Sequence, residues 1–151
     1  MRAGDPLTER PRPPGDAPET VELTETFDGR PGTTALARNA AAMFVRTVEG
    51  ATGRRADAAG TDALLLVVSE LVANACRHAP GPCSLRLGWR PGRLEVAVAD
   101  ACEAEPAGRR PDLVAGTGGF GWPLVSRLAE SVRISHPAEG GKCIQVSLPA
   151  W

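Results

Sequence analysis

An apolar stretch of helical length, residues 64–79 (LLLVVSELVANACRHA), carries a carboxylate, a carboxamide and two basic groups. In a helix of 3.6 residues per turn the positions that share one face are Glu70, Asn74, Arg77 and His78. Each polar group that is buried without a partner costs about 1–3 kcal/mol, and an unpaired charge costs more. The stripe therefore faces either water or a bound polar ligand.

A glycine-rich segment, residues 116–121 (GTGGFG), follows downstream and leads directly into another helical pattern. Glycine lets backbone N–H groups approach a phosphate closely, and the start of a helix adds a positive dipole end. The candidate phosphate-binding positions are Gly116, Gly118, Gly119 and Gly121. The alternative is an ordinary tight turn or flexible linker, but two phosphate-friendly elements in one small chain favour a nucleotide site.

A third candidate is Asp100, which ends the strand-like segment VAVAD. A carboxylate at the step where a chain leaves a sheet can accept a hydrogen bond from the amino group of adenine, although aspartate also suits turn initiation. Arg77 and His78 lie in the last turn of their helix, where the dipole alone favours a cation. The sequence leaves the roles of His78 and Lys142 open.

The elements that must position these residues follow from periodicity and from helix and turn signals. Residues 1–20 are rich in proline and charge and are expected to form a disordered arm, and residues 21–151 are predicted to form one domain. The predicted elements are an edge strand at 21–27, a helix from an N-cap at Thr33 or Thr34 to 50–53, a helix from an N-cap at Thr61 to Pro80, strands at 84–89 and 94–100 joined by a hairpin, a long loop at 101–119, a helix at 123–130, and strands at 132–135 and 142–148. Hairpins in place of repeated βαβ units predict an α+β, two-layer fold with a mixed, mostly antiparallel sheet and its helices on one face.

Composition excludes several classes of protein. The 151 residues carry a formal net charge of −1, with both signs mixed along the chain, so no nucleic-acid partner is expected. The four cysteines show no metal-binding or redox spacing, which favours a reduced, cytoplasmic protein. The longest apolar run, residues 63–68, is far short of a membrane span, and the first twenty residues contain acidic groups where a signal peptide has an apolar core.

Residues 70–79 (ELVANACRHA) resemble the N box of the ATP-binding fold shared by gyrase, Hsp90, histidine kinases and MutL, the GHKL superfamily. Asp100, followed by Pro106, resembles its adenine-binding box, and residues 118–125 (GGFGWPLV) are similar to its second glycine box. Within the superfamily the N box is most similar to that of the stand-alone anti-sigma factor serine kinases, which commonly reads SELVxNAxxHA. The resemblance extends over residues 27–148 and implies the Bergerat ATP-binding fold.

The resemblance implies ATP and Mg²⁺ as cofactors. Mg²⁺ takes oxygen ligands and keeps several waters, so the carbonyl of Asn74 and phosphate oxygens suffice to hold it. Glu70 is implied as the catalytic general base, which accepts a proton from an attacking hydroxyl. Asp100 is implied as the adenine acceptor, and the four glycines as contacts to the phosphates.

The activity implied by the resemblance is phosphorylation of a serine on an anti-sigma factor antagonist, with a sigma factor as a second partner and a homodimer as an assembly seen in the family. The alternative is a non-catalytic module that binds ATP and holds such a partner. GTGGFG also fits a dinucleotide-binding fingerprint, but no strand precedes it directly. A protein kinase would need HRD and DFG motifs, and a P-loop enzyme a Walker A motif; the sequence has none of these.

Overall fold

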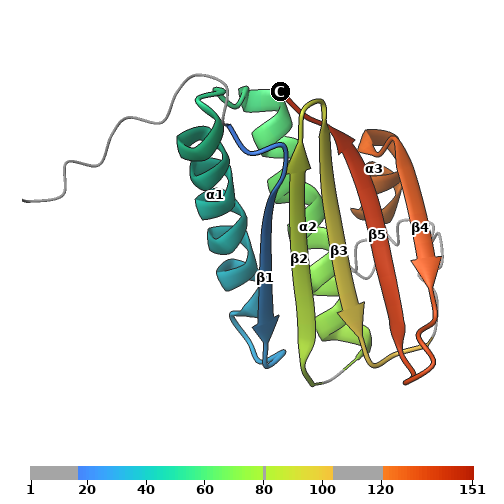
Figure 1. Cartoon of the computed structure of the whole chain (residues 1–151). Coiled ribbons are helices and arrows are strands. Elements are labelled where there is room, and N and C mark those ends of the chain that lie inside the picture. The colour runs from blue at the N-terminus through green and yellow to red at the C-terminus, as the bar shows by residue number, and fades with distance from the viewer. Residues whose placement is uncertain (1–16, 80, 104–120) are drawn as a thin grey trace, which may run out of the picture.

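The computed structural model describes residues 17–79, 81–103 and 121–151, and within these ranges the chain forms two layers. One layer is a five-stranded sheet in the order β1-β2-β3-β5-β4, and the helices cover one face of it (Figure 1). All four strand pairings are antiparallel. The elements are β1 (Val21–Phe27), α1 (Thr33–Thr52), α2 (Ala58–His78), β2 (Cys83–Arg90), β3 (Arg93–Asp100), α3 (Gly121–Leu128), β4 (Ser131–Ser135) and β5 (Lys142–Pro149). The predicted α+β class and element order are confirmed.

The strands lie where period-two alternation predicts them. β1 pairs only with β2, so its position at the sheet edge is as predicted. β2 and β3 form a hairpin in which Arg90 pairs with Arg93 across the predicted Pro-Gly turn. Gly92 adopts a left-handed φ of 79°, which glycine reaches without the steric cost that other residues meet. The expectation of a disordered arm falls mainly on residues 1–16, which lie outside the described residues.

The starts of α1 and α2 differ from the prediction. α1 has Gly32 as its N-cap, and the hydroxyl of Thr33 donates to the carbonyl of Arg30 instead of capping the helix. α2 begins at Ala58, because the carboxylate of Asp57 accepts a 2.5 Å hydrogen bond from the backbone N–H of Gly60. This cap satisfies a backbone donor that would otherwise lack a partner at the helix start, so Thr61 lies inside the helix and is not its N-cap.

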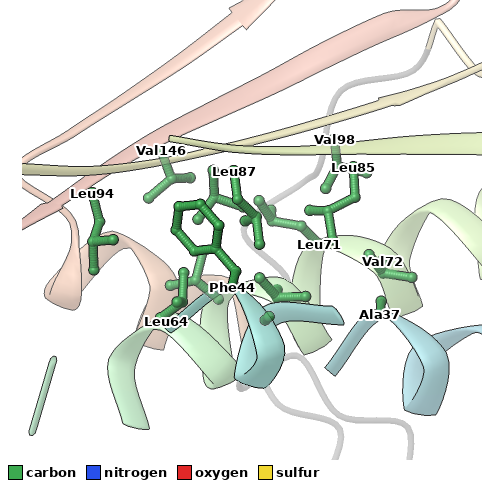
Figure 2. Packing of buried hydrophobic residues seen from close by; sticks show 14 of the residues in the cluster. Ala37, Phe44, Leu64, Leu71, Val72, Leu85, Leu87, Leu94, Val98 and Val146 are labelled. Carbon is green, nitrogen blue, oxygen red and sulfur yellow. The ribbon is translucent and has the colours of Figure 1, made fainter. Parts of the chain in front are cut away.

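The core fills the space between the helix layer and the sheet (Figure 2). Side chains from β2, β3 and β5, including Leu87, Leu94 and Val146, meet Phe44 of α1 and Leu71 of α2, and all five are at most 2% exposed. Burial of this kind stabilises a domain by about 25 cal/mol for each Å² of apolar surface removed from water. α2 therefore packs against the sheet beside α1, which fixes the direction of its polar stripe.

α2 is also the one helix of the described ranges with the length and apolar composition that a membrane crossing needs. Six of its residues are fully or almost fully buried in the core cluster, among them Leu64, Val67 and Val68. The core helix of a globular domain has the same composition, so the apolar character of α2 is explained by its packing against the sheet.

Candidate functional site

The polar stripe of α2 divides into two parts. Glu70 and Asn74 are half-buried, whereas Arg77 and His78 are exposed in the last turn of the helix. Glu70 and Asn74 are one helical turn apart and so project from the same side. No residue of the described ranges forms a hydrogen bond or an ion pair with the side chain of either one. A carboxylate and a carboxamide are thus held side by side, without a polar partner among the residues that the structure describes.

The first residue of α3 packs directly against the carboxylate of Glu70. A Cβ atom added to Gly121 would overlap Cδ and Oε2 of Glu70 and would lie 3.0 Å from Oε1. Glycine at this position lets the backbone of α3 approach the carboxylate so closely. The structure thus brings together two predicted site residues that are far apart in the sequence, Glu70 and Gly121.

Asp100 lies at the end of β3, as predicted, but its carboxylate already has a partner. The ammonium of Lys142 donates to Asp100 Oδ1 at 3.0 Å and to Oδ2 at 2.9 Å, and it donates further to the carbonyl of Cys102 at 3.2 Å. The backbone N–H of Cys102 donates to Oδ1 at 2.8 Å. Both charged side chains are only 1% exposed, so this is a buried ion pair with a nearly complete set of hydrogen bonds.

The turn before β5 places Lys142 against Asp100. Gly140 and Gly141 have φ of 100° and 76°, in the left-handed region that favours glycine. A Cβ on Gly141 would collide with the backbone carbonyl oxygen of Asp100. The two glycines thus allow the turn to pass directly over the end of β3, and the register of the sheet then pairs Asp100 with Lys142.

Two cysteines lie close together near Asp100, one near the end of α2 and one at the start of β2. Burial raises the pKa of the Cys83 thiol to about 11, and the neighbouring Cys76 and the charge of Asp100 act in the same direction. Cys76 follows Asn74 by two residues on α2, and Cys83 begins β2. The C-terminal part of α2, the end of β3 and the start of β5 therefore lie at the same end of the two-layer structure (Figure 1).

Asn74 is the side chain of this site that would bind a magnesium ion. No group of three or more His, Cys, Asp or Glu residues able to hold a metal is found in the described ranges. The carboxamide oxygen of Asn74 is a suitable hard ligand, and Mg²⁺ commonly combines one or two protein ligands with substrate phosphates and water. The donor set therefore fits a magnesium ion that arrives with a phosphate ligand.

Three of the predicted phosphate contacts, Gly116, Gly118 and Gly119, lie outside the described residues. A hollow of about 280 Å³ lies on the sheet face away from the helices, lined by Arg86, Arg93 and Arg133 among others. Because α2 covers the opposite face of the sheet, this hollow is separate from the site formed by Glu70 and Asn74.

The sequence reasoning missed the partner of Asp100. Lys142 is the only lysine among 17 basic residues, and it directly follows two glycines at the start of a strand. Lysine is almost never fully buried without a partner, so a lone lysine in a strand with apolar alternation was a usable signal. It predicts a buried carboxylate across the sheet, and Asp100 at the end of a strand was the natural candidate.

Comparison with known proteins adds to this geometry. Residues 29–148 match the family model described as the histidine kinase-like ATPase domain. No curated protein matches the chain. The crystal structure of the RsbU and RsbW domains of Rv1364c from Mycobacterium tuberculosis is similar in fold, with a TM-score of 0.57 and 19% sequence identity. That similarity covers 86% of this chain but 33% of the other, so this chain spans about a third of the length of its structural relative.

The family match includes the α2 stripe, the end of β3, α3 and almost all of β5, and the antiparallel sheet with its helices on one face agrees with it. The chain therefore belongs to the histidine kinase-like ATPase domain family, within the GHKL superfamily.

Proposed function

We propose that this chain is an ATP- and Mg²⁺-dependent protein serine kinase that phosphorylates an anti-sigma factor antagonist. The observation that carries the proposal is the position of the Glu70 carboxylate, which lies one turn from Asn74 and against the first residue of α3. Family membership supports ATP as the nucleotide. The N-box sequence around Glu70 supports the serine-kinase branch, and with it an antagonist domain, a sigma factor or both as partners.

In this proposal each residue has a limited task. Asn74 holds the magnesium ion, which neutralises charge on the phosphates when it is bound. Gly121 offers backbone N–H at the start of α3, where the helix dipole favours a phosphate. Asp100 accepts a hydrogen bond from the base. Phosphoryl transfer depends mainly on such positioning and charge neutralisation.

Glu70 acts on the attacking group. Its carboxylate accepts the proton of the substrate serine hydroxyl while the serine oxygen forms a bond to the γ-phosphorus. The bond between that phosphorus and the oxygen that bridges it to the β-phosphate breaks, and ADP leaves with the bridging oxygen. General-base assistance of this kind contributes about 10²–10⁴ in rate.

The test is incubation of the chain with ATP labelled in the γ-position, Mg²⁺ and a candidate antagonist domain. We expect labelled serine with the parent, and a rate about 10²–10⁴ lower with Glu70→Gln at unchanged ATP affinity. ATP binding by the parent without any labelled serine would instead favour the non-catalytic module. Equal rates for the parent and Glu70→Gln would refute the role of Glu70 as the base.

A further inference from the structure

Asp100, the carboxylate proposed to bind the nucleotide base, already forms an ion pair with a buried cation. Asp100 is the acceptor that the proposed function assigns to the base, yet its side chain is 1% exposed and both of its oxygens accept from the Lys142 ammonium. A ligand that reaches Asp100 therefore meets Lys142 at the same point.

Most of the donors and acceptors of the Asp100–Lys142 pair already take part in hydrogen bonds. An ammonium has three donors, and Lys142 uses them on the two oxygens of Asp100 and on the carbonyl of Cys102. A carboxylate oxygen has two lone pairs, and Oδ1 of Asp100 accepts from Lys142 and from the backbone N–H of Cys102. Oδ2 accepts from Lys142, and its second lone pair has no partner among the described residues.

We propose that Lys142 is a specificity-determining residue of the base site, which competes with the 6-amino group of adenine for Asp100. This inference depends on the proposed function, because it assumes that Asp100 reads the base of the nucleotide. A free carboxylate accepts from a 6-amino group and repels a 6-oxo group. The positive charge of an ammonium beside it weakens the first effect and offsets the repulsion in the second.

The consequence is weak discrimination between purines. The parent chain binds ATP and inosine triphosphate, which carries a 6-oxo group, with similar affinity. A chain without the ammonium at position 142 prefers ATP, because Asp100 then has no positive charge beside it to weaken its hydrogen bond with a 6-amino group or to offset its repulsion of a 6-oxo group.

The experiment measures the affinities for ATP and inosine triphosphate by calorimetry, in the presence of Mg²⁺, for the parent and two variants. Lys142→Met removes the charge but leaves a buried carboxylate without its cation, so its folding is checked by circular dichroism. Lys142→Gln keeps a neutral amide donor for Asp100 and is the variant that tests the inference if the first fails to fold. Arg133→Met, on exposed β4, removes one positive charge from the sheet elsewhere and is the matched control.

We expect the ratio of ATP affinity to inosine triphosphate affinity to rise about tenfold in the Lys142 variants and to stay unchanged in the control, as for one hydrogen bond to a charged group. The same ratio in the parent and in folded Lys142→Gln, with ATP bound in both, would overturn this inference and leave the proposed function standing. Binding of neither nucleotide by any folded form would overturn the proposed function and this inference with it.

Discussion

Replacement of Gly121 by alanine tests the contact between α3 and the Glu70 carboxylate. The added Cβ would overlap Cδ and Oε2 of Glu70. These atoms are the end of a flexible side chain, so the carboxylate can turn away at a rotamer cost of about 0.5–1.5 kcal/mol. Alanine also regains up to about 1 kcal/mol of helix propensity over glycine. The free energy of unfolding should therefore fall by no more than about 1.5 kcal/mol.

The activity should respond differently. A displaced carboxylate can no longer meet the substrate hydroxyl, so phosphoryl transfer should fall by at least about 100-fold, the lower end of a general-base contribution. Urea unfolding and single-turnover transfer of labelled phosphate measure the two effects separately. Gly50→Ala is the matched control, because Gly50 also lies in a helix but has open space around its Cβ position, and it should keep the parent rate.

A double variant connects the loss to Glu70. In a Glu70→Gln background the further change Gly121→Ala should cost almost nothing in rate, since the two changes remove the same contribution. If Gly121→Ala lowered the rate by the same factor in both backgrounds, Gly121 would act independently of Glu70. An unfolding cost of several kcal/mol would show that the backbone, and not the carboxylate, absorbs the collision.

The other predictions concern the elements that position the site. Asp57→Ala should lower the free energy of unfolding by about 0.5–2 kcal/mol in urea titration, because α2 loses its N-cap; an unchanged midpoint would contradict the cap. Gly141→Ala should cost at least about 2 kcal/mol in the same assay, and more than Gly140→Ala, because only Gly141 would place a Cβ against the backbone of Asp100; equal costs would refute this close approach. Stability should be independent of the Cys83 thiol below pH 9 and fall by roughly 2–3 kcal/mol towards pH 11, because the folded state keeps this proton, with its pKa raised from 9.0 to about 11, after the unfolded chain has released it. Parallel pH profiles for the parent and Cys83→Ala would contradict that assignment.

The strands and their order along the chain could be predicted because their signals are local. Period-two alternation marks β2 and β3, and the Pro-Gly pair between them dictates a hairpin. The helical period placed Glu70 and Asn74 on one face of a single helix, and both residues lie one turn apart on α2. Family membership over residues 29–148 is consistent with that resemblance.

The helix starts were harder because several polar residues compete for the same task. Asp57 and Thr61 both suit an N-cap, and the segment between them contains Gly60, a poor helix former. Asp57 prevails because its carboxylate reaches the backbone N–H of Gly60. α3 likewise begins at Gly121, two residues before the predicted Pro123, and the proline lies within the first turn, where its missing N–H costs nothing.

The contacts between distant elements were not predicted from the sequence, even where a lone lysine offered a signal. The pair of Asp100 and Lys142 depends on the register between β3 and β5, which a single sequence does not specify across 42 residues. The approach of Gly121 to Glu70 depends in the same way on how α3 packs against α2. Phosphate contacts by Gly116, Gly118 and Gly119, a cytoplasmic location and a homodimer remain predictions.

Magnesium-dependent ATP binding by Asn74→Ala tests the central claim most directly. Calorimetry with ATP and Mg²⁺ should show at least about a tenfold loss of affinity in this variant, because the metal loses its only proposed side-chain ligand. Asn39→Ala, at an exposed position of α1, should match the parent. Equal affinity of Asn74→Ala and the parent would contradict the account, because Glu70 and Asn74 would then not face a magnesium-bound triphosphate.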